Sequence, residues 1–307
     1  MEKLLQDLPL ARFAVDRFAQ LRAEPTWLER LWAAPTTRVL IIREGTLPVT
    51  DEVSLIWVKP ESVDVRLADI ADFSYLLGAT EEHTYMAISD KNIEVDGATW
   101  VSLRDTGAHF SAHDVGLATT ATALASWHRT HVHCTRCGMQ THVIGAGWSR
   151  KCPIDSSEHY PRTEPAMIVA VEDAEGRILL GRRKEWTPGW YSTLAGFVEA
   201  GESSEACVIR EVFEESGVHL DPTSLRYLGS QPWPFPASLM LAYRATAITT
   251  DIVVEEAEMA DVRWFSREHF IRDCNMQTLR LPGPTTIAFH LIQDWFGEPV
   301  PSEWTRA

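Results

Sequence analysis

Residues 196–218 constrain the fold of this chain more than any other part, because they place charged side chains and glycines at fixed spacings. The segment reads GFVEAGESSEACVIREVFEESGV. Ser203 is a suitable N-cap residue and Gly217 a suitable C-terminal cap, so the pattern predicts a helix of about three to four turns between them. Apolar runs at 166–171 and 178–180, around a turn at 173–176, predict two strands, and 190–194 predicts a third strand leading into the segment. The sequence therefore predicts a strand, a loop and a helix at the end of a sheet.

Three glutamates of the predicted helix form a candidate metal site. Glu214 and Glu215 follow Glu211 by three and four residues, so the three carboxylates share one face of the helix. Carboxylates this close repel one another unless a cation lies between them, and clustered oxygen ligands favour Mg2+ or Mn2+. Such ions also bind phosphate oxygens. The pattern therefore indicates a divalent-metal site that accepts a phosphate-containing ligand.

Other residues of the helix have predicted structural roles. Arg210 is expected to point away from the metal site and to pair with Glu202, which would brace the loop before the helix. Ile209, Val212 and Phe213 are expected to face the core. The alternative is an exposed acidic helix, which three glutamates within five residues would indicate on their own. The fixed spacing of both glycines, Glu202 and Arg210 favours the metal site.

The composition limits the class of protein. At 307 residues with 45% hydrophobic residues, the chain is expected to form about two globular domains. A net charge of -15 disfavours a broad nucleic-acid surface, so an RNA would be held locally through its end. Five cysteines, an odd number, argue against a disulfide framework, and Cys207 and Cys274 are interpreted as buried thiols. No signal-peptide pattern or apolar run of about 18 residues is found, which predicts a cytoplasmic protein without membrane contact.

The chain is expected to contain several parts in sequence. Short apolar runs at 38–42, 54–58 and 84–88 predict a mostly β N-terminal domain at residues 1–115. An alanine-rich segment predicts a linking helix at 116–131. The remaining parts are a zinc-ribbon-like segment at 132–160, the domain with the acidic helix at 161–297 and a tail at 298–307.

A second candidate metal site lies in the ribbon-like segment. Cys134 and Cys137, followed after fourteen residues by Cys152 and then by Asp155, have the spacing of two zinc knuckles. Asp155 stands where a fourth cysteine is expected, and a carboxylate also binds zinc, so these four residues are the predicted ligands of a structural Zn2+. The alternative fourth ligands are His133, His142 and His159. The other alternative is a ribbon that keeps its fold by packing, without metal.

The combination of motifs resembles a known family. The acidic segment resembles the Nudix box at every defining position, and residues 230–238 downstream read SQPWPFPAS, a rigid loop of prolines and aromatic rings. The ribbon segment, the box and this loop together resemble the NADH pyrophosphatase and NAD-capped RNA hydrolase branch of the Nudix hydrolases over about residues 100–296. The resemblance implies an α/β (α+β) protein with a Nudix α/β/α sandwich and a mixed sheet. A zinc-ribbon-like segment and a smaller, mostly β N-terminal domain would precede it.

The resemblance also implies an activity. Enzymes of this branch hydrolyse the diphosphate bond of NADH or NAD+ to (reduced) nicotinamide mononucleotide (NMN) and AMP, and some remove NAD caps from RNA 5′ ends. It implies Mg2+ or Mn2+ as the cofactor, NADH, NAD+ and NAD-capped RNA as substrates, and a homodimer. In such a site metal ions neutralise the diphosphate and activate a water for attack on phosphorus.

Individual residues follow from the same resemblance. The carbonyl of Ala195 with Glu211, Glu215 and Glu258 is expected to bind the divalent metal, with Glu214 assisting, and loss of Glu215 is expected to be the most damaging. The implied substrate pocket comprises Tyr160, Gln231, Pro232, Trp233, Pro234, Phe235, Pro236, Ala237, Ser238 and Ala288, with Arg104 as a further contact. Trp233, Phe235 and Tyr160 are the candidates to stack on a base.

Two other functions compete with this interpretation. One is a Nudix hydrolase of another nucleoside diphosphate, such as ADP-ribose or a dinucleoside polyphosphate, and residues 230–238 argue against it. The other is a non-catalytic Nudix module that binds a nucleotide, an RNA or a protein. Such a module has no need of all four candidate glutamates, so their joint presence favours the hydrolase.

Overall fold

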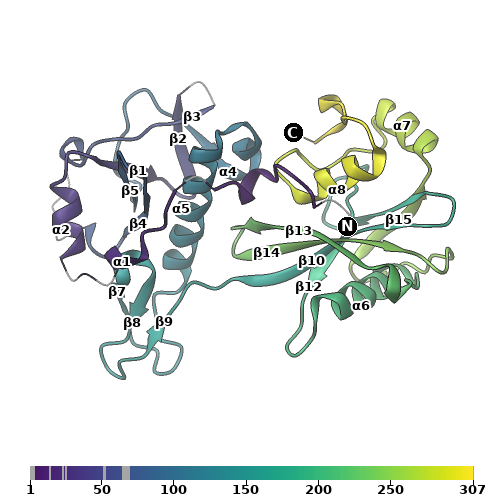
Figure 1. Ribbon diagram of the computed structural model, residues 1–307. Coiled ribbons are helices and arrows are strands. Elements are labelled where there is room, and N and C mark those ends of the chain that lie inside the picture. The colour runs from purple at the N-terminus through teal and green to yellow at the C-terminus, as the bar shows by residue number, and fades with distance from the viewer. Residues whose placement is uncertain are drawn as a thin grey trace. The chain divides into compact units, whose positions relative to one another are not determined.

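The chain forms two compact units, each with hydrophobic clusters of its own. The computed structural model describes residues 4–13, 15–22, 24, 26–50, 53–63 and 70–306 (Figure 1). The C-terminal unit comprises Met1–Leu8, Glu164–Pro232 and Ser238–Ala307, and the N-terminal unit comprises Pro9–Thr163 and Trp233–Ala237.

A six-stranded sheet forms the middle of the C-terminal unit. Its strands are β10 (Glu164–Glu172), β11 (Ile178–Arg183), β12 (Leu194–Phe197), β13 (Arg226–Trp233), β14 (Ser238–Thr246) and β15 (Met259–Phe265). The main order is β13-β14-β10-β11-β15, and β12 also pairs with β10. Strand β10 runs parallel to β14 and antiparallel to β12 and β11, so the sheet is mixed, as expected.

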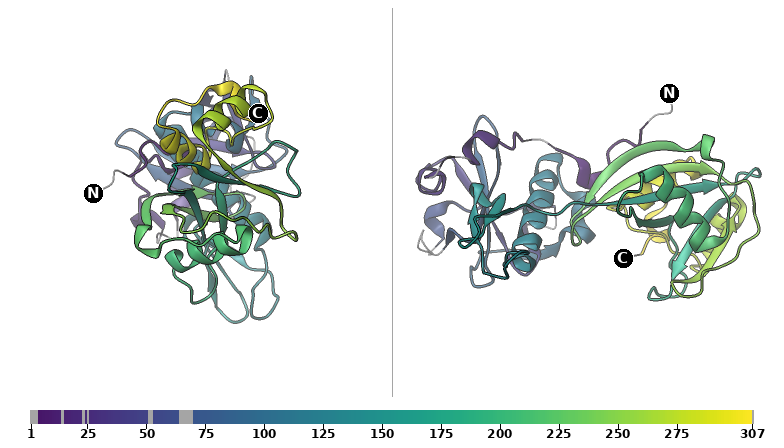
Figure 2. Two further views of the ribbon diagram at one scale, coloured as in Figure 1. Left: turned by 90° about the vertical axis from the view of Figure 1, so that its right-hand side faces the viewer. Right: turned by 90° about the horizontal axis from the view of Figure 1, so that it is seen from below.

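Helices cover both faces of this sheet. They are α6 (Ser204–Ser216), α7 (Arg267–Asn275) and α8 (Ile287–Phe296). Alternate residues of β10 belong to two different cores: Met167 and Val169 pack in the cluster that contains α6 residues, whereas Ile168 and Ala170 pack in the cluster that contains α7 and α8 residues. Figures 1 and 2 show α6 on one face and α7 and α8 on the other. The predicted α/β/α sandwich is therefore confirmed.

Two of the three strands predicted near the acidic segment lie as expected. Residues 166–171 fall within β10 and 178–180 within β11, joined by a turn in which the N–H of Gly176 donates to the carbonyl of Asp173. The prediction of a strand at 190–194 is wrong, because β12 begins only at Leu194. Before it the chain makes single bridges to different partners, Trp190 to Arg280 and Ser192 to Gly181, so no continuous ladder forms.

The N-terminal unit contains small sheets, short helices and one long helix. Its strands are β1 (Thr37–Ile42), β2 (Thr46–Thr50), β3 (Ser54–Leu55), β4 (Ser74–Ala79), β5 (Thr84–Ser89) and β6 (Thr99–Ser102). Its helices are α1 (Ala19–Arg22), α2 (Trp27–Trp32), α4 (Leu103–Thr106) and α5 (Ala112–Thr130). The strand orders are β1-β5-β4 and β3-β2-β6. The predicted run at 54–58 is a strand only at its start, and Val58 then bridges to Val39.

Helix α5 begins earlier than the alanine-rich segment suggested, because Ser111 caps it by accepting a hydrogen bond from the N–H of Asp114. The ribbon strands β7 (His142–Ile144), β8 (Ser149–Lys151) and β9 (Glu158–His159) form a sheet in the same unit. His128 of α5 binds the ribbon: Nε2 lies 2.8 Å from the Gly147 carbonyl oxygen, and Nδ1 lies 2.9 Å from Nη1 of Arg150. Burial lowers the pKa of His128 to about 4, so this imidazole is neutral at pH 7.

Cys207 and Cys274 are buried free thiols, as interpreted from the sequence. Within the described residues, no helix has both the length and the apolar character needed to span a bilayer.

Candidate active site and zinc cluster

The helix of the acidic segment is capped by the residues predicted from the sequence. The Oγ of Ser203 accepts a hydrogen bond from the N–H of Ala206 at 3.2 Å. At the other end Gly217 has φ 71°, and its N–H donates to the carbonyl oxygen of Phe213 at 2.7 Å. These two caps fix where α6 starts and stops, and they therefore fix which side chains it presents to the loop after β12.

Gly196 makes room for the carboxylate of Glu211. A Cβ at position 196 would lie 1.9 Å from Cδ of Glu211, far inside any allowed contact. Strand β12 and helix α6 therefore approach so closely that the Glu211 carboxylate packs on the backbone of the strand at Gly196, the residue that follows Ala195. Burial raises the pKa of Glu211, against the opposite effect of the Arg210 charge.

Glu215 is buried, with 4% of its surface exposed. Among the described residues its Oε2 has no hydrogen-bond partner, and its Oε1 lies 3.6 Å from Nη2 of Arg183. Burial raises the pKa of Glu215 to about 8; Arg183 lowers it, and the charges of Glu211 and Glu258 raise it further. Burying a carboxylate oxygen without a hydrogen-bond partner lowers the free energy of unfolding. A cation bound to this oxygen would remove that destabilisation.

The raised pKa of Glu215 predicts that the metal-free protein loses stability between about pH 6.5 and pH 8. The pKa of Glu215 in the folded protein is about 8, above the ordinary value of 4.5, so the folded protein keeps a proton that the unfolded chain has lost. Because the folded state binds more protons than the unfolded state, the free energy of unfolding falls as the pH rises. Below about pH 6.5 the buried His128 acts in the opposite direction. Melting temperatures in EDTA should show Glu215→Gln gaining on the wild type as the pH rises from about 4.5 to about 8, because His128 is present in both proteins and its effect cancels in the difference. A difference that does not change with pH would contradict the raised pKa.

The remaining predicted metal ligands lie around Glu215. The carbonyl oxygen of Ala195 accepts a hydrogen bond from Nη2 of Arg183 at 3.1 Å. The charge of Glu258 raises the pKa values of both Glu211 and Glu215, so this exposed side chain lies within electrostatic range of them although it is far from both in sequence. Arg183 thus joins the Ala195 carbonyl to Glu215, and the charges of Glu211 and Glu258 act on Glu215. Among the described residues, these carboxylates do not gather as closely as the ligand atoms of the ribbon cluster. Glu214, whose side chain is 53% exposed, lies at the edge.

Arg210 braces the loop before α6, as predicted. Its Nε and Nη2 donate to the two carboxylate oxygens of Glu202 at 2.8 and 2.9 Å, and Nη2 donates to the carbonyl of Phe197 at 3.1 Å. The prediction that Arg210 points away from the metal site is wrong, because Nη1 donates to Glu211 at 2.9 Å and to Glu214 at 2.8 Å. The long side chain reaches both the loop and the next turn of the helix. The pairing lowers the pKa of Glu202 to about 2.

The core-facing side of α6 differs in part from the prediction. Val212 is fully buried and Ile209 is partly buried, as expected. Phe213 is 48% exposed and stacks on His219, with ring centroids 4.7 Å apart. The buried stripe passes through Val208 and Val212, four residues apart, and Phe213 lies beyond its edge.

The predicted substrate residues belong to both units. In the C-terminal unit Gln231 is fully buried, and its Nε2 donates to the carbonyl of Thr285 at 3.0 Å. Ala288 of α8 and Ser238 at the start of β14 are also buried, and Pro232 is partly buried. Gln231 therefore connects β13 to the segment before α8, a role in addition to any contact with a ligand.

The aromatic residues of the predicted pocket lie in the N-terminal unit. Trp233 and Phe235 meet edge to face at 4.9 Å and pack against the cluster that includes α5 residues. The Cζ of Arg104 lies 5.6 Å from the Trp233 ring centroid. Tyr160 is 64% exposed, and its hydroxyl donates to Glu158 at 2.8 Å. Pro234 is buried, Ala237 is partly buried and Pro236 is exposed.

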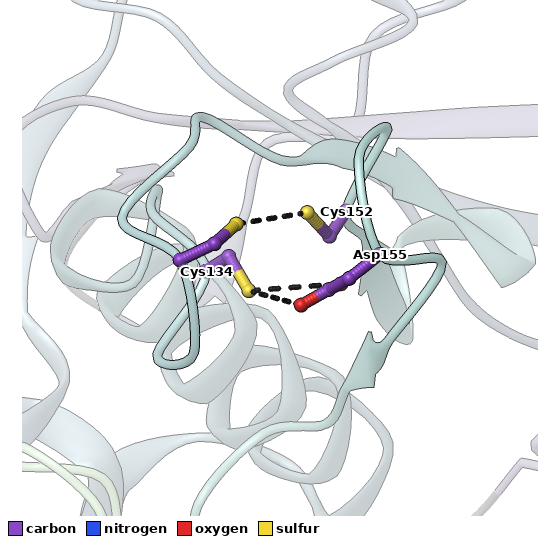
Figure 3. Close-up of side chains that lie close together, drawn as sticks. Cys134, Cys152 and Asp155 are labelled. Atoms are coloured by element: carbon purple, nitrogen blue, oxygen red, sulfur yellow. Dashed lines mark hydrogen bonds between the residues drawn. The ribbon is translucent and has the colours of Figure 1, made fainter.

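The four predicted zinc ligands converge in the ribbon. One ligand atom from each of Cys134, Cys137, Cys152 and Asp155 lies within 4.8 Å of all the others. The Sγ of Cys134 is 3.6 Å from Oδ2 of Asp155, and the Sγ atoms of Cys137 and Cys152 are 3.5 Å apart (Figure 3). Thiolates at about 2.3 Å from a tetrahedral zinc are about 3.8 Å apart, so the cluster has the size of a zinc site.

Ser157 holds the aspartate of this cluster in place. Its hydroxyl and its N–H both donate to Oδ1 of Asp155, at 2.6 and 2.9 Å. The same hydroxyl lies 3.4 Å from the Sγ of Cys134 and is the main reason why the pKa of that thiol is lowered to about 6. Among the described residues the cluster contains no histidine, so the alternatives His133, His142 and His159 are not part of it.

Sequence reasoning missed two residues, Arg183 and Ser157. The signal for Ser157 was its place two residues after Asp155, the spacing at which a serine bonds a preceding aspartate. Arg183 gave no local signal, because its contacts lie 12 and 32 residues away in the chain.

The comparisons with protein families agree with this geometry. Residues 162–281 match the NUDIX domain, and residues 129–160 match the NADH pyrophosphatase zinc ribbon domain. The fold and the site therefore define a Nudix protein that carries a zinc ribbon.

Curated relatives narrow this class. The NAD-capped RNA hydrolase NudC of Pseudomonas aeruginosa strain LESB58 is 39% identical over 69% of this chain and 72% of its own length. The protein of the same name from Mycobacterium bovis strain BCG / Pasteur 1173P2 is 38% identical over 68% of both chains. The chain belongs to the Nudix family, in the branch of the NAD-capped RNA hydrolases.

Among solved structures, a NUDIX hydrolase from Nitrosomonas europaea covers 54% of this chain and 94% of its own, at 19% identity and a TM-score of 0.42.

Proposed function

We propose that this chain hydrolyses the diphosphate bond of NADH and NAD+ to (reduced) NMN and AMP, and that it removes NAD caps from RNA 5′ ends. The observation that carries the proposal is the buried carboxylate of Glu215, whose Oε2 has no hydrogen-bond partner in the described part of the chain, next to Arg183 and the Ala195 carbonyl. A purely structural helix has no use for a buried carboxylate with an unpartnered oxygen. The match to the NADH pyrophosphatase zinc ribbon and the NudC relatives support the substrate class.

The donor set fits a small divalent cation, and we propose Mg2+ or Mn2+. All the donors are oxygens, which these ions prefer, and the unpartnered Oε2 of Glu215 is available to bind one. When bound, the ion would neutralise the diphosphate and lower the pKa of a water. Glu211, Glu215 and Glu258 would hold it, with Glu214 assisting from the rim.

The other residues act by keeping this donor set in place. Gly196 admits the Glu211 carboxylate against the strand, and the paired Glu202 and Arg210 fix the loop between β12 and α6. Arg210 also holds the carboxylates of Glu211 and Glu214. Hydrolysis adds water across one P–O bond of the diphosphate and leaves a phosphate on each product.

Rates with four substrates test the proposed choice of substrate. NADH, NAD+, ADP-ribose and a short NAD-capped RNA would be compared at equal concentration with Mn2+. The proposal expects NADH, NAD+ and the capped RNA all to be cleaved with higher kcat/KM than ADP-ribose. Preference for ADP-ribose would favour the competing Nudix hydrolase, and no turnover of any substrate would favour a binding module.

We also propose that Cys134, Cys137, Cys152 and Asp155 bind a structural zinc ion. Asp155→Ala should lower the zinc affinity by about a hundredfold, because it removes a charged ligand, whereas Asp155→Cys should keep the affinity high. Zinc transfer from each purified variant to a colorimetric chelator measures this. If Asp155→Ala releases zinc no more readily than the wild type, then Asp155 is not a ligand.

The resemblance and the sequence also predict a homodimer and a cytoplasmic location, and these stay predictions. The same holds for contacts of the substrate with Tyr160, Ala288, Arg104 and residues 231–238. The molar mass of the protein, measured by light scattering as it leaves a size-exclusion column, would test the dimer.

A further inference from the structure

Arg183 lies inside the candidate metal site, next to two of the proposed ligands. It is the last residue of β11. Side chains alternate along a strand, so Arg183 shares a face with Leu179, which packs in the cluster containing α6 residues. The pairing of β11 with β15 shifts between Arg182 and Arg183, at the point where β11 ends.

One nitrogen of this guanidinium contacts two of the proposed metal ligands. The Nη2 of Arg183 donates to the Ala195 carbonyl oxygen at 3.1 Å and lies 3.6 Å from Oε1 of Glu215. The Arg183 side chain is 42% exposed, whereas that of Glu215 is only 5% exposed. The guanidinium therefore reaches into the site from its open side and has room to leave.

A divalent ion and this guanidinium would compete for the Ala195 carbonyl oxygen and for space at the Glu215 carboxylate, where Arg183 lies near Oε1. An ion of this kind binds oxygen at about 2.1 Å, within the space that an N–H donor occupies when it bonds the same atom. Arg183 is also a cation and lowers the pKa of Glu215. Its charge would therefore repel the ion as well as occupy its place.

We infer that Arg183 is an internal competitor of the divalent ion: it occupies the position between Ala195 and Glu215 when no ion is bound and leaves when the ion enters. The inference rests on the metal site of the proposed function. It makes Arg183 a residue that sets the metal affinity, rather than a catalytic residue.

The test is to titrate the protein with Mn2+ in the absence of substrate. The electron paramagnetic resonance signal of free Mn2+ measures how much of the ion is bound. Arg183→Met should bind Mn2+ about tenfold more tightly than the wild type, because the ion no longer displaces a charge-assisted hydrogen bond. Arg183→Gln repeats the test with a polar side chain. Unchanged or weaker Mn2+ binding in both variants would overturn the inference, because it would mean that Arg183 supports the ligands instead of competing for them.

Arg182→Met is the matched control. It removes the same charge one residue away, but Arg182 donates to the carbonyl of Trp186 at 3.3 Å and, within the described part of the chain, has no hydrogen bond or ion pair with a proposed ligand. Its Mn2+ affinity should stay within about twofold of the wild type. An equal gain in both variants would show a general charge effect and would also overturn the inference.

Thermal melting gives a second readout that needs no turnover. Mn2+ should raise the melting temperature of Arg183→Met by more than that of the wild type, since tighter binding to the folded state stabilises it more. The two proposals fail separately. Wild-type turnover of NADH with no gain in Mn2+ affinity would reject only the role of Arg183, and tighter Mn2+ binding without any turnover would reject only the enzymatic function.

Discussion

Replacing Glu215 by Gln is expected to lower kcat/KM for NADH by about a thousandfold while leaving the protein folded. Glu215 is the most buried of the proposed ligands, and the substitution removes its charge at nearly constant volume. Loss of a charged ligand weakens the held ion and the stabilisation of charge at the diphosphate. Steady-state kinetics at saturating Mn2+, with circular dichroism to follow the fold, would measure both effects.

Glu205→Gln is the matched control for this variant. Glu205 lies in the first turn of the same helix, where its carboxylate contacts Ser204 and Tyr243, away from the candidate site. Its kcat/KM should stay within about twofold of the wild type. If Glu215→Gln turns over NADH about as fast as this control, then Glu215 is not a metal ligand. That result would contradict the proposed mechanism.

The second large effect is expected from a single methyl group. Gly196→Ala would place a Cβ 1.9 Å from Cδ of Glu211, so the carboxylate or the strand must move. A displacement of about 1 Å in a catalytic group costs about a hundredfold in rate, and we expect a loss of that size in kcat/KM for NADH. Mn2+ binding should weaken in the same variant, because Glu211 is a proposed ligand.

Gly283→Ala separates this effect from the general cost of replacing a glycine. A Cβ at position 283 would meet its nearest neighbour, the carbonyl oxygen of Arg306, at an ordinary 3.7 Å. This control should keep wild-type kinetics. If Gly196→Ala also keeps them, then the close packing of Glu211 on β12 has no functional role.

The parts of the site that the sequence predicted are those set by local spacing. Ser203 and Gly217 act within a few residues of themselves, and the pair of Glu202 and Arg210 spans only eight residues. Helix geometry fixes such contacts, so the start and end of α6 and the brace of its loop could be read directly. The zinc ligands also follow from spacing, within two short knuckles.

The parts that the sequence did not predict depend on how distant segments pair. The pairing of β11 with β15 shifts between Arg182 and Arg183, where β11 ends, and Arg183 there contacts Ala195 and Glu215 from a distant part of the chain. The mispredicted strand at 190–194 has the same cause, since its residues bridge to separate partners. Phe213 failed for a smaller reason, because it lies one residue beyond the buried stripe of α6.

The most direct test of the central claim is the identity of the products formed from NADH by the purified wild-type chain with Mn2+. Chromatography should show AMP and reduced NMN in equal amounts, and their formation should stop when EDTA removes the metal. Cleavage at another bond, such as release of nicotinamide with ADP-ribose, or the same rate in EDTA, would contradict metal-dependent hydrolysis of the diphosphate.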